Sequence, residues 1–232
     1  MTCLAHHLND ILTACEEADI EITDVIAGPM ASSFVTLNKT QKIAGCLLAN
    51  IGCETTSIIV FENNIPISLE VFPFGSNDIT NDIALGLKVS LEDAEAIKTG
   101  KTADLSFSKR KLDEIIIARL ADIFDLINDH LKRIDRSGLL PAGVILTGGG
   151  AALANIEDFA KIALHLPSKR SNLELQGNLK VIQQDTEWAV AYGLAMVGLG
   201  ADEGGIVQSG STAGIIGKLF KRFWNWLKQF LP

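Results

Sequence analysis

The chain opens with apolar residues at steps of three and four, the spacing of an amphipathic helix, over residues 4–18. Short runs that are apolar, or that alternate with polar residues, follow it, and two of them flank Asn63-Asn64, a favourable hairpin turn. Ser90 is placed as the N-cap of a further helix. The elements predicted in this half are strands at 20–27, 43–49, 57–62 and 65–72 and helices at 30–37, 78–87 and 91–98.

The second half contains the longest apolar stripe of the chain. It predicts a helix over residues 108–136, which Gly138 ends. A short buried strand at 144–146 then runs into three consecutive glycines. The remaining predictions are a helix at 155–163, a polar loop at 166–180, a candidate strand at 181–183, a buried helix at 188–197 and a Gly/Ser-rich linker at 201–214.

Strands that run into glycine-containing loops, with helices between them, predict an α/β fold. The length of 232 residues suits one large domain or two small ones, and the pattern shows no second complete core. The chain carries 28 acidic and 20 basic side chains, and its net charge is −8. This acidic balance argues against a general nucleic-acid binder, so no nucleic-acid partner is expected.

The cysteines and histidines form no recognisable metal or catalytic pattern. The cysteines lack C-x-x-C spacing, so we expect free or buried thiols in a reducing cytosol. His130 and His165 have no plausible partner near them in the sequence and are expected at the surface. We therefore assign no catalytic residue and no metal ligand. The N-terminus also shows no signal-peptide pattern.

The last 18 residues differ from the rest in charge and in aromatic content. Residues 215–232 carry four cations and no acid, so their charge is +4 and the remainder carries −12. A helix here would have one broad apolar, aromatic face and one basic face, which is typical of a helix lying in a membrane interface. The predicted membrane-binding residues are Ile216, Lys218, Leu219, Phe220, Lys221, Arg222, Phe223, Trp224, Trp226, Leu227, Lys228, Phe230 and Leu231.

Two other interpretations of this tail stay open: a core or coiled-coil helix, which usually carries acids as well, and a calmodulin-like target helix. The terminal position and the preceding linker favour the membrane. Each cation near an anionic leaflet contributes about 1 kcal/mol. A helix of this length is a marginal anchor, so we expect attachment to need several copies through self-assembly.

Two glycine-containing loops follow predicted strands and are candidates for binding phosphate. The first, at 50–56, reads Asn-Ile-Gly-Cys-Glu-Thr-Thr, and its free N–H groups and two hydroxyls can hold phosphate oxygens. The second contains Gly148, Gly149 and Gly150, which let the backbone approach a ligand closely. Each loop also has a purely structural interpretation, as a plain turn or a tight strand-to-helix connection. Neither loop matches the Rossmann or P-loop fingerprint.

The two loops, in this order and about 95 residues apart, resemble a pair found in a known family. The chain resembles the C-terminal portion of the FtsA family of bacterial cell-division proteins, within the actin, hexokinase and DnaK-chaperone superfamily. The resemblance runs over nearly all 232 residues. Its most specific motifs are GSNDITNDIA at 75–84 and the Thr-Gly-Gly-Gly sequence at 147–150.

The resemblance implies an actin-like (ribonuclease H-like) second lobe with a mixed sheet, flanking helices and a C-terminal amphipathic helix. It also implies a site for ATP with magnesium, in which 50–56 is the second phosphate loop, the three glycines line the adenosine and Arg119 lies at the base or ribose. Asn50 stands where the family usually has Asp, and the first phosphate loop would precede this chain. The implied nucleotide-binding residues are Gly52, Thr55, Thr56, Arg119, Gly148, Gly149 and Gly150.

The resemblance further implies how the chain divides into domains. The stretch 100–111 is shorter than the family usually has, which implies a reduced outer subdomain. The expected parts are an N-terminal helix (1–18), an inner actin-like subdomain (19–90 and 140–200), the reduced outer subdomain with the long helix (91–139), a flexible linker (201–214) and the amphipathic helix (215–232).

The resemblance and the tail together imply a cell-division adaptor. Such an adaptor would self-associate and tether the FtsZ ring to anionic lipids on the cytoplasmic face of the bacterial inner membrane, at the division site. Its ATP hydrolysis would be weak or absent. The alternative is an ATPase or sugar-kinase-like phosphotransferase fragment of the same superfamily, against which Asn50 and the tail count. A poorly functional remnant of a split gene is a third interpretation.

Overall fold

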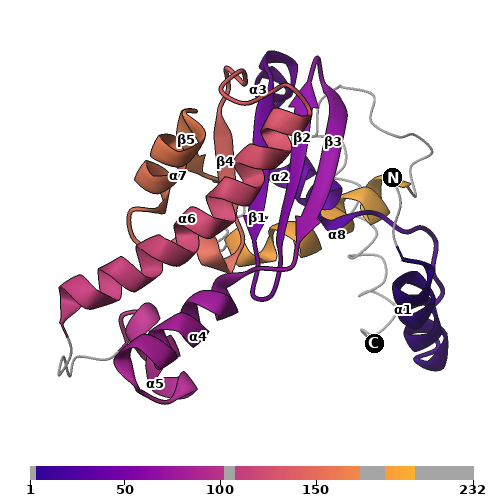
Figure 1. The fold of residues 1–232 in the computed structure, drawn as a ribbon. Coiled ribbons are helices and arrows are strands. Elements are labelled where there is room, and N and C mark those ends of the chain that lie inside the picture. Colours follow the sequence, from indigo (N-terminus) through magenta and orange to yellow (C-terminus); the bar gives the residue numbers. More distant parts are fainter. Residues whose placement is uncertain (1–3, 102–107, 173–185, 202–232) are drawn as a thin grey trace, which may run out of the picture.

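A computed structural model describes residues 4–101, 108–172 and 186–201 (Figure 1). A five-stranded mixed sheet in the order β3-β2-β1-β4-β5 forms the centre of the fold. The pairs β1–β2 and β2–β3 are antiparallel, whereas β1–β4 and β4–β5 are parallel. The strands are β1 (Cys46–Ile51), β2 (Thr56–Glu62), β3 (Ile65–Phe72), β4 (Val144–Thr147) and β5 (Ser168–Arg170).

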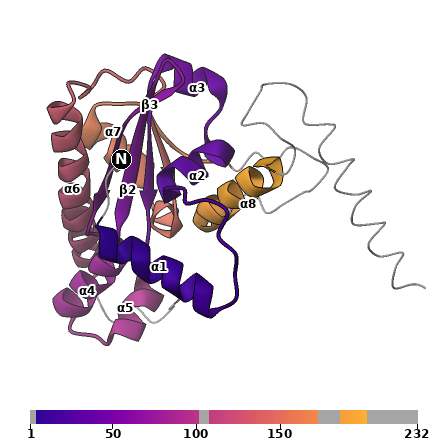
Figure 2. The same cartoon turned by 90° about the vertical axis from the view of Figure 1, so that its right-hand side faces the viewer.

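Helices cover both faces of this sheet, as the edge-on view in Figure 2 shows. One face carries α6 (Lys109–Arg133) and α7 (Ile156–Leu164). The other carries α2 (Gly28–Thr36), α3 (Lys39–Ala44) and, packed on α2, α8 (Ala189–Ala201). The mixed sheet with flanking helices confirms the predicted α/β fold.

The central strand β1 shows why the sequence reads as one continuous apolar run. Successive side chains of a strand point to opposite faces of its sheet. Leu47 and Ala49 therefore pack into the core beneath α6, and Cys46 and Leu48 into the core beneath α2. Because both faces are covered, the strand is apolar from Cys46 to Ala49, and its polar residue, Asn50, lies at the end that opens into the loop.

Below the sheet in Figure 1 lie α4 (Ser76–Leu87) and α5 (Leu91–Lys98), which pack against each other. The Ser90 Oγ accepts a hydrogen bond from the Asp93 N–H at 3.1 Å, which confirms the predicted N-cap. Arg119 of α6 donates two hydrogen bonds to the Asp82 carboxylate of α4, at 2.6 and 3.0 Å. These bonds hold α4 on α6. The division into subdomains at residues 90 and 139 stays a prediction.

Several predicted elements are confirmed nearly residue for residue. Asn63 and Asn64 have φ angles of 52° and 64°, as a tight hairpin turn requires, so the β2–β3 hairpin is confirmed. The helices predicted near 4–18, 30–37, 78–87, 91–98, 108–136, 155–163 and 188–197 correspond to α1 (Ala5–Glu17), α2, α4, α5, α6, α7 and α8.

Three local predictions are wrong, each for a reason of context. Residues 20–27 form no strand, and Ile20 and Val25 are exposed because no neighbouring strand pairs with them. The helix α3 takes the first residues of the predicted strand at 43–49, and its capping box joins Asn38 and Gln41. The edge strand β5 lies in the predicted loop, since edge strands tolerate polar residues.

The helix α8 was expected to be buried, and that expectation is wrong. Leu194, Met196 and Leu199 are each about 44–45% exposed. The helix contacts α2 through its small residues. The approach is close, since a Cβ on Gly193 would lie 1.9 Å from the carbonyl oxygen of Ala31 in α2. Across residues 4–101, 108–172 and 186–201, no helix has the length and apolar character needed to cross a membrane.

His130 of α6 was expected at the surface, but it is buried beneath β3 and only 4% exposed. Its Nε2 lies 2.7 Å from the Ser68 Oγ, and burial lowers the pKa of the imidazole. Glu70 and Arg133 also approach the Nδ1 atom, at 3.4 and 3.2 Å. His165 is exposed, as predicted. The strand predicted at 181–183, the linker beyond residue 201 and the tail lie outside the described residues.

Two isoleucines of α6 give a matched test of this packing. Ile123 is 1% exposed beneath the sheet, whereas Ile117 is 38% exposed. We expect Ile123→Ala to lower the free energy of unfolding by about 2–5 kcal/mol, because it leaves a cavity in the core. Ile117→Ala should cost no more than about 1 kcal/mol. Urea unfolding of the two variants measures both values, and equal losses would contradict the orientation of α6.

Candidate functional site

A cleft of about 720 Å³ opens where β1 and β4 end. These strands are parallel neighbours, with Asn50 paired to Thr147, so the loops that follow them emerge side by side. The cleft is lined by both loops, the C-terminal part of α5 and Glu187. Its volume falls in the range of about 300–1,000 Å³ that is usual for small-molecule sites.

The first loop is fixed by backbone contacts on both of its sides. The Gly52 N–H donates to the carbonyl of Thr55 at 2.9 Å, which closes the turn. The carbonyls of Gly52 and Cys53 accept from Ser76 and Asn77, at 2.9 and 2.8 Å. The N-terminal end of α4 therefore sits directly against the loop.

This close approach explains the glycine that opens the GSNDITNDIA motif. A Cβ on Gly75 would lie 2.4 Å from the carbonyl oxygen of Cys53, a distance that no side chain tolerates. The Gly75 N–H donates to the Asp78 carboxylate at 2.8 Å. The motif thus builds the junction between the first loop and α4.

The structure brings only part of the predicted first loop to the cleft. Gly52 lines it, together with Asn50 and Cys53. Thr55 is exposed outside the lining, and Thr56 is fully buried at the start of β2. The Thr56 Oγ1 has no hydrogen-bond partner among the described residues.

The three glycines of the second loop have different reasons to be glycine. Gly148 has a φ of +87°, and a Cβ on it would lie 2.3 Å from the Asn50 Oδ1. A Cβ on Gly150 would lie 2.4 Å from the Ile51 Cγ2. Gly149 alone has room, since its nearest neighbour is Glu187 at 3.6 Å. Two glycines therefore serve packing against β1, and the third faces the cleft.

Thr186 fastens the glycine loop to the end of the sheet. Its carbonyl accepts from the Thr147 hydroxyl at 3.1 Å and from the Gly148 N–H at 3.2 Å. Its own hydroxyl donates to the carbonyl of Gly148 at 3.0 Å. Because Thr147 and Thr186 are both buried, these bonds exchange little with water. They place Glu187 at the rim of the cleft.

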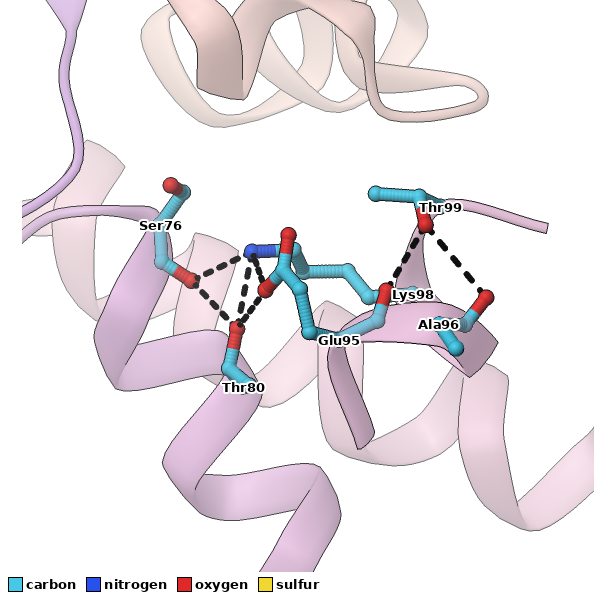
Figure 3. Close-up of polar contacts among 6 residues, drawn as sticks. All are labelled: Ser76, Thr80, Glu95, Ala96, Lys98 and Thr99. Carbon is cyan, nitrogen blue, oxygen red and sulfur yellow. Dashed lines mark hydrogen bonds and ion pairs between the residues drawn. The ribbon is translucent and has the colours of Figure 1, made fainter. Parts of the chain in front are cut away.

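The wall formed by α4 and α5 contains a charged network, which Figure 3 shows. The Lys98 Nζ lies 2.7 Å from the Glu95 carboxylate and donates to the Thr80 hydroxyl at 2.8 Å and to the Ser76 carbonyl at 3.1 Å. The Thr80 hydroxyl donates to Glu95 at 2.6 Å. Burial raises the pKa of Glu95, but the hydrogen bonds from Lys98 and Thr80 outweigh it and hold the pKa below its ordinary value.

This network sets the charge of the cleft. Lys98 is the only cation among the described residues that line it, and its side chain is just 6% exposed. Glu95 balances that charge, and Glu187 adds a carboxylate. Within residues 4–101, 108–172 and 186–201, no group of three or more His, Cys, Asp or Glu side chains is arranged to hold a metal ion.

Arg119 does not reach this cleft. Its guanidinium is held by Asp82 at 2.6 and 3.0 Å and lies over the Phe74 ring, 6.0 Å from the ring centre. Hydrogen bonds to Asp82 raise the pKa of Arg119. The structure therefore brings Gly52, Gly148, Gly149 and Gly150 together and leaves Thr55, Thr56 and Arg119 outside the lining.

Sequence reasoning missed the residues that form the polar wall. Glu95 and Lys98 are three residues apart on a helix, so they share one face. That spacing was the available signal for Glu95 and Lys98. Ser76 lies in the GSNDITNDIA motif, which resembles the FtsA family, whereas Glu187 had no signal in the sequence.

The comparisons with known proteins identify the family to which the chain belongs. The model of the family "Cell division protein FtsA" matches residues 47–193, which include both loops and α5. The chain belongs to the FtsA family.

FtsA proteins of several bacteria are similar to the chain over most of its length. FtsA of Bacillus subtilis is 29% identical over 208 residues, which is 81% of this chain and 46% of that protein. FtsA of Escherichia coli K12 is 25% identical over 260 residues, or 99% of this chain and 61% of that protein. The chain thus spans about half the length of the curated relatives that it matches.

Solved structures show that the fold is actin-like. MreB5 of Spiroplasma citri bound to ADP has a TM-score of 0.70 at 14% identity, covering 88% of this chain and 69% of that one. The PilM–PilN type IV pilus biogenesis complex contains a chain with a TM-score of 0.67 at 21% identity, covering 82% and 57%. At these identities the likeness establishes the fold alone.

The distinct roles of Gly148 and Gly149 can be separated by mutation. Gly148→Ala should lower the free energy of unfolding by more than about 2 kcal/mol, because it combines a positive φ with a clash against Asn50. Gly149→Ala has space and should cost no more than about 1 kcal/mol. Thermal unfolding of the two variants measures the difference, and equal stability of both would show that packing against β1 does not require Gly148.

Proposed function

We propose that the cleft at the ends of β1 and β4 binds an adenine nucleotide, ATP or ADP. The observation that supports this most directly is the meeting of the two glycine loops beside Lys98. Membership of the FtsA family supports it as well. A protein of the same fold, MreB5, was solved with ADP.

The residues present fit a nucleotide in shape and in hydrogen-bonding capacity. Gly149 leaves room beside the backbone of the second loop, and Gly52 lines the cleft in the first. Glu95 supplies an acceptor on the α5 wall, which suits a hydroxyl of a ribose, and Lys98 holds that carboxylate in place. Gly148 and Gly150 hold the second loop in place. Thr55, Thr56 and Arg119 are not part of the proposed site, since they lie outside its lining.

The charge of the cleft bears on the phosphates and on magnesium. Lys98 is already paired with Glu95, so this wall offers little net positive charge to a polyphosphate. Asn50 and Glu187 present oxygen atoms of the kind that magnesium prefers. Magnesium bound there would neutralise phosphate charge.

We further propose that nucleotide binding is regulatory and that hydrolysis is weak or absent. Asn50 occupies the place where the FtsA family usually has Asp, and an amide neither accepts a proton nor carries a charge. Among the described lining residues, Glu95 is held ionised by two hydrogen bonds, which makes it a poor general base. These features argue against the alternative of a phosphotransferase.

At the level of the cell, we propose that the chain is a division adaptor. Its basic, aromatic tail (215–232) would bind anionic lipids on the cytoplasmic face of the inner membrane, and its actin-like body would self-associate and hold FtsZ at the division site. Self-association would raise the avidity of a marginal anchor. The family and the charge of the tail support this proposal.

Nucleotide binding is tested by titrating ADP into the full chain in a calorimeter, with and without magnesium. Lys98→Met removes the ion pair that positions Glu95. A hydrogen bond from a ligand to a charged group such as Glu95 contributes about 1.5–3 kcal/mol, so we expect the substitution to raise the dissociation constant about tenfold or more. The substitution also leaves the Glu95 carboxylate unpaired in the cleft.

Lys132→Met is the matched control for this titration. Lys132 lies near the end of α6, pairs only with Asp129 among the described residues and is 59% exposed, so its removal makes the same charge change at the surface. Circular dichroism of both variants verifies that they fold. Equal affinity of the two variants, or no binding of ADP by the unaltered chain, would refute the proposed site.

Membrane binding is tested by sedimentation with phosphatidylglycerol and phosphatidylcholine vesicles. We expect the full chain to pellet with the anionic vesicles only, and to carry FtsZ with it. Replacing Lys218 and Lys221 by Gln should lower the bound fraction severalfold, because each cation contributes about 1 kcal/mol.

Deletion of residues 215–232 separates the roles of tail and body. The shortened chain should stay in the supernatant with every vesicle and should still bind ADP. Pelleting without the tail would place membrane contact in the body. If the full chain pellets while FtsZ stays in the supernatant, the result would support membrane binding and refute the adaptor proposal.

A further inference from the structure

A second hollow, of about 550 Å³, lies on the face of the sheet opposite α6 and α7. It is bounded by the end of α2, by α3, by β4 and by the edge strand β5, and it lies on the sheet face that α2 covers in Figure 2. None of its lining residues belongs to the cleft at the glycine loops. It is therefore a separate feature of the molecule.

The lining of this hollow is basic, although the chain as a whole has a net charge of −8. Lys39, Lys42 and Lys169 line it, and no Asp or Glu is among the described lining residues. Arg170 also lines it, but the guanidinium of Arg170 donates to the Leu153 carbonyl at 2.9 Å and so points toward α7. Strand alternation places Lys169 and Ser171 together on the α2 side.

Within the part of the chain that the structure describes, Lys42 is partly desolvated and has no ion-pair partner. Its Nζ lies 5.0 and 5.2 Å from the ring centres of Phe61 and Phe34. Its only hydrogen bond among the described residues is a long one, 3.5 Å, to the Ser33 Oγ. Burial lowers the pKa of Lys42, the sign of an ammonium group that lacks a compensating charge.

Ser171 adds an unused hydrogen-bonding group at the floor of the hollow. The residue is 4% exposed, and its N–H donates to the Leu146 carbonyl at 2.8 Å, which extends the β4–β5 pairing. The Ser171 Oγ has no partner among the described residues. A buried hydroxyl without a partner is costly, so native proteins rarely keep one unless a ligand or water satisfies it.

We propose that this hollow is a binding site for a small, soluble, phosphate-bearing molecule. The phosphate would lie between the ammonium groups of Lys42 and Lys169 and accept a hydrogen bond from the Ser171 hydroxyl. An apolar part of the ligand would lie against Leu37 and Ile145, which are apolar residues of the lining. In this hollow the ligand would supply a counter-charge for Lys42 and a hydrogen-bond partner for Ser171, which the described residues do not.

The probe for the test is inorganic pyrophosphate, titrated into the full chain by calorimetry and followed by ³¹P NMR. We expect saturable binding that falls about tenfold or more in Lys42→Met, since a charged contact is lost. Ser171→Ala should weaken binding severalfold. Its unliganded melting temperature should not fall, because the substitution removes an unsatisfied hydroxyl.

Two further substitutions serve as matched controls. Lys132→Met removes an equal charge from the surface of α6, and Lys98→Met removes the cation of the glycine-loop cleft. Both should leave the affinity for pyrophosphate unchanged if the anion binds in the second hollow. Should Lys42→Met fail to fold, Lys169→Met at the exposed edge of the sheet tests the same charge.

The outcomes separate this proposal from the nucleotide proposal. No binding of pyrophosphate by the unaltered chain would overturn it, whatever the affinity for ADP. Loss of binding in Lys98→Met with retention in Lys42→Met would also overturn it, because the anion would then lie in the cleft. A melting temperature that falls in Ser171→Ala would mean that the hydroxyl already has a partner, which contradicts the argument from Ser171.

Discussion

The parallel pairing of β1 with β4 is the interaction on which the candidate cleft depends. It places Asn50 beside Thr147, and it brings loops about 95 residues apart in the sequence to one edge of the sheet. The contact is so close that Gly148 and Gly150 admit no Cβ against Asn50 and Ile51. A ligand bound at this edge would therefore be positioned by two strands of the core, and sites built on rigid strands hold their geometry better than sites on free loops.

Burial of β1 on both faces makes this pairing secure. Because α6 covers one face and α2 the other, a shift of the strand by one residue would exchange the two sets of side chains that now fit two different cores. Thr186 then ties the glycine loop to the sheet from outside it. The FtsA family model begins at residue 47, inside this strand, and ends at residue 193, where α8 meets α2.

The sequence predicted what depends on local pattern and missed what depends on distant partners. The Asn63-Asn64 hairpin, the Ser90 cap and the long helix α6 follow from spacing alone, and all three are confirmed. The burial of His130 depends on β3, 62 residues away from it, so no local rule could place it. The exposure of α8 is a similar case, since an apolar composition does not say how many neighbours a helix has. In the site, the three consecutive glycines could be predicted from the sequence. Lys98 could not, because only the fold brings α5 next to the two loops.

The glycine-loop cleft and the second hollow differ in how their lysines are paired. Lys98 is held by a carboxylate, a hydroxyl and a carbonyl, so its position is fixed and its charge is balanced. Lys42 lies over two aromatic rings and has no such partner among the described residues. A fixed, neutralised lysine suits recognition of a polar group, while an unpaired lysine suits capture of a charge.

The crossing of α2 and α8 has a mechanical consequence. In the part of the chain that the structure describes, α8 rests chiefly on α2, with the backbone of Gly193 against that of Ala31 and Ala189 against Val35. The chain continues from α8 into residues 202–232, so tension applied to that end would reach the sheet through this crossing. The small side chains let α8 approach α2 closely, but they bury little apolar area between the two helices. Under load at that end, α8 would separate from α2 before the hydrogen-bonded strands β1 and β4 separated from each other.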